Sequence, residues 1–190
     1  MNKIQKGRIE QFSDGVFAIA ITLLAIELKV PTLVSSNVIG SISELLPLIP
    51  MIATFILSFV TIAIFWVNHQ QLSQSMGNIS RRMLWINVLL LMFVTLIPFG
   101  TTVVTENPNN MIAVATYSFI LFATSVSFTT LVVHVHKETP HKEVILKRSS
   151  VGPLFYLFAV IACFITIPAA YTLLIIPPIF YFLPRMNTSA

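Results

Sequence analysis

Charged side chains are scarce in this sequence: aspartate, glutamate, lysine and arginine together make up only 9% of its 190 residues. A soluble domain usually carries about 25% charged residues. Hydrophobic residues make up 56% of the chain, and its mean hydropathy is +0.87. Such a chain cannot cover itself with polar groups for water, so the sequence predicts an all-α integral membrane protein.

Cysteine and glycine are also rare. The single cysteine, Cys163, lies in an apolar run, so it forms no disulfide within the chain and is expected to be inert packing. None of the six glycines stands in a TVGYG-like or phosphate-binding context. A nucleophile elbow and a zinc-protease helix signature are missing as well. We therefore expect neither an enzyme nor a bound cofactor.

The histidines and the basic residues suggest two kinds of partner that we do not expect. His134, His136 and His141 are close in sequence, but the first two are two residues apart and do not share a helix face, so a metal site is not expected. The net charge of +4 suggests nucleic acid. However, the basic residues stand between apolar runs, as membrane topology signals do, and this excludes nucleic acid as the expected partner.

The apolar runs predict six transmembrane helices within a single domain, residues 1–190. The expected spans are roughly residues 12–30, 45–70, 83–104, 111–135, 150–167 and 169–183. The last two come from one uncharged run, which we divide at Pro168. A single helix of that length would measure about 54 Å, whereas a bilayer core is about 30 Å thick.

Six spans place both ends of the chain on the same side of the membrane. With this topology, all but one of the 11 lysines and arginines fall on the side of the termini, and Lys29 alone falls on the other. Basic residues accumulate on the cytoplasmic side of membrane proteins. The sequence therefore predicts a multi-pass protein of the cell membrane with both termini in the cytoplasm.

The most informative stretch is residues 8–26, an apolar helix whose first turns carry Arg8, Ser13 and Asp14. At 100° per residue, one stripe of this helix collects residues at i, i+3, i+4 and i+7. These residues are Ile19, Thr22, Leu23 and Ile26. Asp14 lies about 140° from Ile19 around the helix. The charged end and the stripe are thus expected to face different partners.

Asp14 needs a partner, because a charge within the membrane region is costly when it is unpaired. The second span offers donors for it in Trp66, Asn68 and His69. The alternative is a helix cap, in which Ser13 or Asp14 accepts from a free backbone N–H. Both interpretations give Asp14 an anchoring role rather than an ion-binding one.

Two short motifs are similar to those of a known family, the transmembrane protein 175 family of lysosomal potassium channels and their prokaryotic homologues. The RxxxFSD motif at the start of the first helix is matched by Arg8, Phe12, Ser13 and Asp14. The family's FWxNHH stretch is matched by Phe65, Trp66, Asn68 and His69. Gln70 replaces the second histidine of that stretch.

This resemblance implies a homotetramer with the first helix of each subunit around a central pore and no reentrant filter loop. It implies passive conduction of potassium in preference to sodium, with caesium or rubidium as further permeant ions. It places the constriction at Ile19, further apolar pore positions at Leu23 and Ile26, and a selectivity layer at Thr22. A narrow apolar ring of this kind gates by dewetting.

Other interpretations of these residues remain open from the sequence alone. The stripe also suits ordinary helix packing, and the Thr22 hydroxyl also suits a bond to its own helix. Glu27 fits an outer mouth that concentrates cations, a pair with Lys29, or a place among lipid headgroups. As alternative functions we consider a small secondary transporter or proton-coupled carrier, and a non-conducting membrane scaffold. A carrier should carry ionisable residues or a broken helix at mid-membrane.

Overall fold

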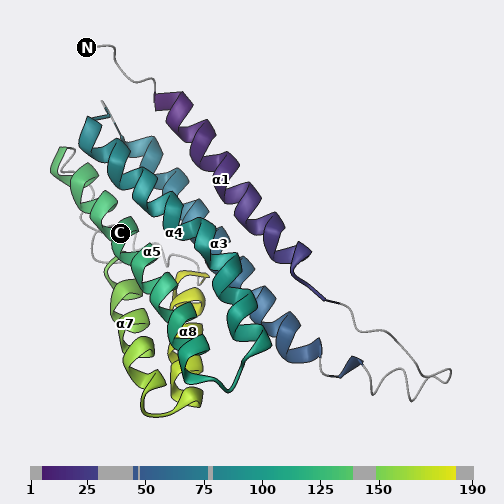
Figure 1. Cartoon of the computed structure of the whole chain (residues 1–190). Helices are drawn as coiled ribbons and strands as arrows, with labels where there is room; N and C mark the ends of the chain where they lie inside the picture. Colours follow the sequence, from purple (N-terminus) through teal and green to yellow (C-terminus); the bar gives the residue numbers. More distant parts are fainter. Residues whose placement is uncertain (1–5, 30–44, 47, 77–78, 139–148, 183–190) are drawn as a thin grey trace, which may run out of the picture.

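The computed structural model describes residues 6–29, 45–46, 48–76, 79–138 and 149–182. Over these residues the chain is all-helical, as predicted (Figure 1). Its helices are α1 (Lys6–Ile26), α3 (Leu48–Ser75), α4 (Arg81–Glu106), α5 (Met111–Glu138), α7 (Val151–Cys163) and α8 (Ile167–Phe182). The first four are long and apolar enough to cross a membrane, whereas α7 and α8 have only 13 and 16 residues.

The long helices extend beyond the apolar runs at the end of the bundle that carries Lys6, Arg81 and Lys137, which we call the basic end. Helix α1 begins six residues before the expected start of the first span, residue 12. At its other end it stops at Ile26 instead of reaching residue 30. We call this other end of the bundle, where α4 reaches Glu106, the Glu106 end.

Side-chain caps fix the starts of α4 and α5. The Ser80 hydroxyl accepts from the backbone N–H of Met83 at 3.2 Å, which satisfies one of the free donors at the start of α4. The Asn110 carbonyl oxygen accepts from the N–H groups of Ile112 and Ala113 at 2.9 and 3.3 Å. The connection between the two helices is therefore a short, well-defined turn.

The break between the last two helices lies earlier than the sequence suggests. Helix α7 ends at Cys163, and α8 begins at Ile167, so the turn precedes Pro168 instead of containing it. A proline fits the first turn of a helix because the N–H it lacks would have no partner there. Helix α8 also continues through Pro177 and Pro178 to Phe182.

Helices α7 and α8 form a hairpin that is shorter than the helices beside it (Figure 1). Its open end lies at the level of Thr129, whose hydroxyl donates to the carbonyl of Ser149 at 2.7 Å. At 1.5 Å per residue α5 is about 42 Å long, and α8 is about 24 Å long. The hairpin therefore runs beside the part of α5 nearest the Glu106 end and stops well before the basic end.

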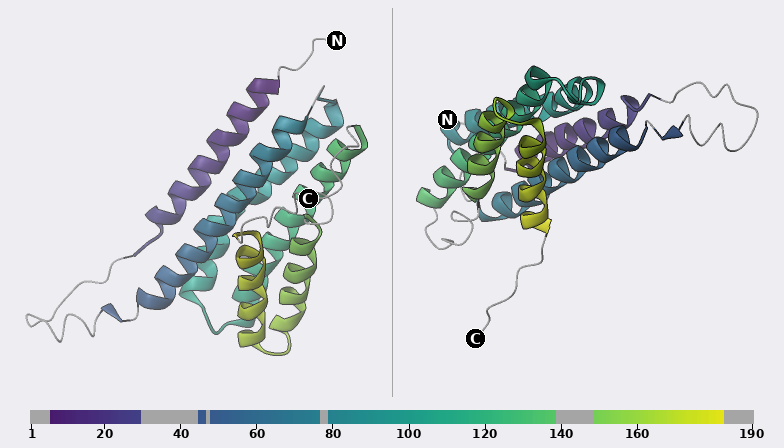
Figure 2. Two further views of the ribbon diagram at one scale, coloured as in Figure 1. Left: turned by 180° about the vertical axis from the view of Figure 1, so that it is seen from behind. Right: turned by 90° about the horizontal axis from the view of Figure 1, so that it is seen from below.

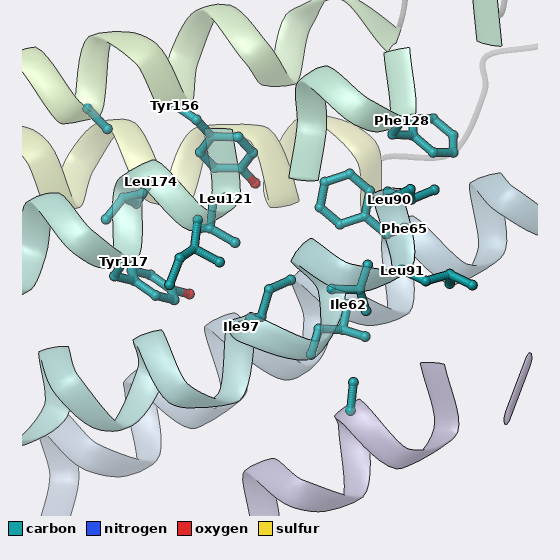
Figure 3. Packing of buried hydrophobic residues seen from close by; sticks show 14 of the residues in the cluster. Ile62, Phe65, Leu90, Leu91, Ile97, Tyr117, Leu121, Phe128, Tyr156 and Leu174 are labelled. Atoms are coloured by element: carbon teal, nitrogen blue, oxygen red, sulfur yellow. The ribbon is translucent and has the colours of Figure 1, made fainter. Parts of the chain in front are cut away.

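Helix α1 lies along one edge of the bundle, and the α7–α8 hairpin lies at the opposite edge (Figures 1 and 2). The hydrophobic core fills the space between α3, α4, α5 and the hairpin (Figure 3). Its largest fully buried side chains include Ile62, Leu90, Ile97, Tyr117 and Leu121. Helices α1 and α3 contribute three buried apolar side chains each to this core, fewer than α4 or α5.

Three hydroxyl groups form a buried polar cluster within this core. The Thr101 hydroxyl lies 2.8 Å from the Ser58 hydroxyl, which lies 2.8 Å from the Tyr117 hydroxyl. The three residues belong to α4, α3 and α5 respectively. Polar groups buried in a membrane protein must be paired internally. This cluster therefore fixes the relative register of the three helices.

Glycine permits a close approach between α7 and α5. A Cβ atom on Gly152 would stand 2.4 Å from the Oγ of Ser125 on α5. Beyond that oxygen, the next atom is the Cβ of Ser125 at 3.6 Å, which is an ordinary contact distance. Small residues of this kind let membrane helices pack closely.

We expect Gly152→Ala to lower the free energy of unfolding by about 1–3 kcal/mol, the usual cost of overpacking. The thermal unfolding midpoint of the purified protein in detergent measures this. Removing the clashing oxygen as well, in Gly152→Ala with Ser125→Ala, should restore most of the loss. Gly7→Ala is the control, because no described atom lies within 4 Å of the added carbon. Equal losses in the single and double variants would contradict this account of the contact.

Candidate functional site

Helix α1 turns one face toward the rest of the chain. Four side chains on this face are at most 2% exposed: Ser13, Phe17, Ala20 and Leu24. Their spacing of four, three and four positions follows the helical repeat, so they form one continuous seam. This seam packs against α3 and α4.

The opposite face of α1 is apolar and uncovered within a single chain. Ile19, Leu23 and Ile26 are 59%, 39% and 74% exposed. Thr22 is exposed between them, and a Cβ atom on Gly15 would meet no described atom within 4 Å. The sequence-predicted stripe therefore lies away from the core. This face is left for lipid or for other copies of the chain.

The Thr22 hydroxyl is engaged within its own helix. It donates to the carbonyl of Ile19 at 2.9 Å. A hydroxyl that donates its hydrogen still has lone pairs for a second partner. In a single chain, then, Thr22 already has a hydrogen bond, and its oxygen remains able to accept or to face a cation.

Asp14 is held by α3. One of its carboxylate oxygens accepts from the indole Nε1–H of Trp66 at 3.0 Å and also from the amide of Gln70. Of the three donors that the sequence suggested, Trp66 reaches Asp14. Gln70, which departs from the family motif, supplies the second hydrogen bond. Both donors come from α3, one turn apart, so the carboxylate ties α1 to that helix.

Next to Asp14, a buried chain of hydrogen bonds joins α1, α4 and α3. The Asn87 amide donates to the Ser13 hydroxyl at 3.0 Å, and the Asn87 carbonyl oxygen accepts from Nε2–H of His69 at 2.8 Å. All three side chains are buried. The ring of His69 also lies 5.6 Å from that of Phe17, between centroids. This network fixes both the depth and the rotation of α1.

Sequence reasoning missed Asn87. The available signal was an amide inside an otherwise uncharged run, because polar groups at such positions usually have a specific partner. Asn68, in contrast, was named as a donor for Asp14, but its amide donates to the carbonyl of Ile64 in its own helix at 2.7 Å. Arg8 and Phe12 are exposed on α1, so the structure does not bring the whole motif together in a single chain.

The first turn of α1 has further contacts with α3 at the basic end. The carboxylate of Glu10 accepts from the hydroxyl of Ser73. The ammonium of Lys6 donates to the carbonyl of Met76 at 2.9 Å and lies 3.8 Å from Glu10. Together with the Asp14 and Ser13 networks, these contacts fasten roughly the first third of α1.

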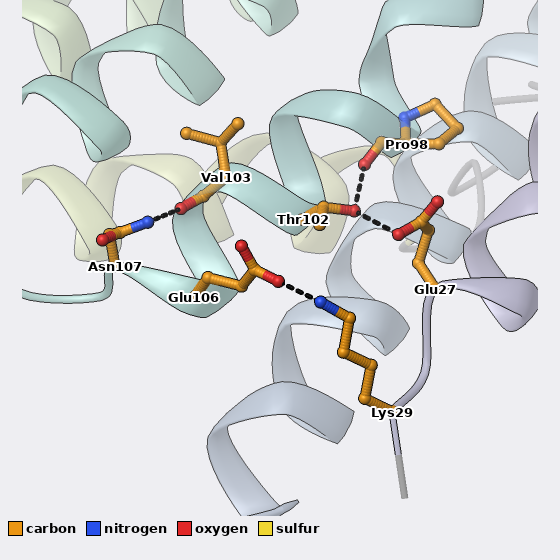
Figure 4. A network of polar contacts seen from close by, with 7 residues as sticks. All are labelled: Glu27, Lys29, Pro98, Thr102, Val103, Glu106 and Asn107. Atoms are coloured by element: carbon orange, nitrogen blue, oxygen red, sulfur yellow. Dashed lines mark hydrogen bonds and ion pairs between the residues drawn. The ribbon is translucent and has the colours of Figure 1, made fainter.

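At the Glu106 end, α1 is fastened to α4 by charged residues (Figure 4). The carboxylate of Glu27 accepts from the hydroxyl of Thr102 at 3.2 Å. The ammonium of Lys29 donates to the carboxylate of Glu106. This hydrogen bond, together with the negative charge of Glu106, raises the pKa of Lys29 above its usual value, so Lys29 stays protonated at neutral pH.

No three potential metal ligands converge among the residues the structure describes. Nδ1 of His134 is 2.9 Å from the carbonyl of Thr130 in its own helix. His141 lies outside the described residues. Cys163 is buried, and its thiol donates to the carbonyl of Ala159 at 3.1 Å.

Comparisons with known proteins point to one family. Residues 8–98 match the family model described as the endosomal/lysosomal potassium channel TMEM175. A protein from Chamaesiphon minutus that is named a potassium channel is 37% identical over 175 residues, 86% of each chain. A protein from Streptomyces collinus with a similar name is 32% identical over 177 residues, 86% of this chain and 85% of its own.

A solved structure and a vertebrate protein extend this result. The crystal structure of a lysosomal potassium-selective channel TMEM175 homolog from Chamaesiphon minutus matches 93% of this chain and 95% of its own, with a TM-score of 0.84 and 35% identity. A Gallus gallus protein named endosomal/lysosomal proton channel TMEM175 is 32% identical over 152 residues. The match covers 73% of this chain but only 30% of that longer protein.

We expect Asn87→Leu to destabilise the protein by about 1–3 kcal/mol, because His69 and Ser13 would each lose a partner in a buried site. The thermal midpoint in detergent measures the loss. Asn68→Leu is the matched control, since it removes the same amide from a residue that bonds to its own helix. If both variants lost the same stability, the bridge from α1 to α4 and α3 would not be the source of the effect.

Proposed function

This chain belongs to the TMEM175 family of potassium channels, and from that membership we propose that it conducts potassium in preference to sodium through a pore lined by α1. The family is one of ion channels, so the chain is not an enzyme. It is also a multi-pass membrane protein. The selectivity and the pore helix are our extension of the family's general function to this chain.

The observation that carries the proposal is the two-faced character of α1. One face and both ends of the helix are fastened to α3 and α4, while its apolar face is uncovered. Four copies arranged with these faces inward would enclose a narrow central pore, lined by the same α1 residues from each copy. We therefore propose a homotetramer, which native mass spectrometry of the purified protein would detect as a four-chain species.

The proposed conduction path is a hydrophobic neck with one polar layer. Rings of Ile19, Leu23 and Ile26 would exclude a continuous water column, so an ion must shed part of its hydration to pass. Thr22 stands between these rings and offers an oxygen to the dehydrated ion. Potassium, rubidium and caesium hold their water less strongly than sodium, so the neck favours them. Closing such a neck needs only a small narrowing that dries it.

The remaining parts of the motif have an anchoring role in this proposal. Asp14, Ser13, Trp66 and His69 hold α1 in one rotation, and Asn68, Arg8 and Phe12 complete the motif outside that network. Ser13 and Asp14 lie off the apolar face that the proposal turns to the axis, whereas the exposed Arg8 and Phe12 lie in line with that face at the basic end of α1. A change in the anchor is therefore expected to act on assembly before it acts on selectivity.

We further propose that all six helices span the membrane as one domain, with the basic end and both termini in the cytoplasm of a cell membrane. The distribution of lysine and arginine supports this orientation. The short hairpin runs beside the part of α5 that extends from the Glu106 end. Its helices, about 20 and 24 Å long, are shorter than the bilayer core of about 30 Å, so the proposal requires the bilayer to thin beside them.

A reporter fused to either terminus is expected to read cytoplasmic, because both ends then lie on the side rich in lysine and arginine. A fluorescent protein at the C-terminus, active only in the cytoplasm, and a protease-accessible tag at the N-terminus measure this in intact cells. The control places the same tag after Asn109, in the turn at the Glu106 end. A terminus that reads as external would contradict the six-span topology.

Liposomes holding the purified protein under a potassium gradient are expected to release potassium, because the proposed pore conducts passively. Rubidium and caesium should substitute for it, and sodium should pass more slowly. Empty liposomes are the control, and a luminal pH dye is read in parallel because the vertebrate relatives are named proton channels. Potassium flux coupled at a fixed ratio to a second ion would indicate a carrier, and no flux would indicate a scaffold.

Ile19→Ala is expected to raise conductance several-fold and to lower discrimination between potassium and sodium, because a shorter side chain widens and wets the neck. Thr22→Val keeps the width and removes the hydroxyl, so it should reduce selectivity if that oxygen contacts ions. Leu24→Ala is the matched control, because Leu24 is buried in the seam. Reversal potentials in mixed potassium and sodium measure all three. Equal effects of Ile19→Ala and Leu24→Ala would mean that α1 does not line the pore.

A further inference from the structure

The contacts at the Glu106 end of α1 direct its charged residues to one side. After Ile26 the chain stays close to the helix, since the N–H groups of Glu27 and Leu28 bond to the carbonyls of Leu23 and Ala25 at 3.3 Å. The side chain of Glu27 then reaches Thr102, and that of Lys29 reaches Glu106 (Figure 4). Thr102 and Glu106 are one turn apart on α4, so both links draw the end of α1 toward that helix.

Lys29 is a cation close to the exposed face of α1. It stands three residues beyond Ile26, which is at most about 11 Å of extended chain. That reach is comparable to the Debye length of about 10 Å at 0.1 M salt. An unpaired ammonium at this place would therefore act on any ion that approaches the end of the helix. In a tetramer the effect would come from four lysines.

Glu106 makes the net charge at this end negative, because Glu27 and Lys29 alone would sum to zero. Glu27 and Glu106 carry two negative charges and Lys29 carries one positive charge, so the group is negative overall. The link to Glu106 holds the ammonium against α4, on the side away from the exposed stripe. The side chains of Lys29 and Glu106 are 72% and 50% exposed, so salt screens this pair. Exposed pairs of this kind add little to stability.

We propose that Glu106 is an electrostatic shield: it holds Lys29 against α4 and thereby keeps the entrance at the Glu106 end attractive to cations. This inference rests on the proposed function, because it requires α1 to line a cation pore. Glu106 therefore acts as a positioning residue for Lys29. The negative charge of Glu27 then remains at the mouth of the pore to attract cations. The consequence is a directional effect, because only ions entering at this end meet the lysine first.

Whole-cell recording of the full-length channel tests the shield through three variants, Glu106→Gln, Lys29→Gln and the double variant. Glu106→Gln should lower the potassium current that enters at the Glu106 end by about twofold or more at low ionic strength. The current in the opposite direction serves as an internal reference, so the number of channels cancels in their ratio. Lys29→Gln and the double variant should keep the ratio at or above that of the wild type.

Two further conditions separate electrostatics from a structural effect. Raising the ionic strength at a fixed potassium concentration should remove most of the Glu106→Gln effect, because salt screens the exposed lysine. Glu106→Asp keeps the charge and should restore the ratio. The proposed role of Glu106 is wrong if the reduced current ratio persists when Lys29 is also replaced. It is also wrong if the currents in both directions decrease equally. A wild type that passes no potassium would overturn the proposed function and this inference together.

Discussion

Pairing of the polar groups on α1 is the constraint on which the rest of this structure depends. In a bilayer a polar side chain has no water to bond to, so it must find a partner within the protein. Ser13 finds Asn87 on α4, and Asp14 finds Trp66 and Gln70 on α3. Rotating the helix by one residue would turn each of these groups away by about 100°. The polar pairs therefore determine which apolar side chains remain exposed.

The two ends of α1 are fastened by interactions of different physical character. At the basic end the hydrogen bonds that join Ser13, Asn87 and His69 are buried, with Asn87 and His69 both less than 5% exposed. Salt cannot screen such contacts, and breaking them leaves unsatisfied groups. At the Glu106 end the link from Lys29 to Glu106 is exposed and ionic. The basic end thus fixes the helix, whereas the Glu106 end responds to the ions around it.

Much of the fold follows from the sequence, because long apolar runs between polar segments indicate membrane helices directly. The sequence also predicted that Asp14 is held by α3, and that Asp14 and the stripe of Ile19 face different partners. It did not reveal that Asn87 joins the network or that Asn68 bonds only to its own helix, because both depend on the register between helices. The position of the last turn was misjudged for a local reason: Pro168 lies in the first turn of α8 instead of between the two helices.

The division of α1 into two faces limits how such a pore can select its ions. Ser13 lies in the seam and Asp14 is bound to α3, so neither is available at the proposed axis. The exposed face offers apolar side chains and the Thr22 hydroxyl, whose hydrogen is already donated to Ile19. Discrimination then has to come from the cost of removing water, partly offset by an oxygen that can only accept. A neck of this kind favours ions that lose water easily, and it binds none of them strongly enough to stop their passage.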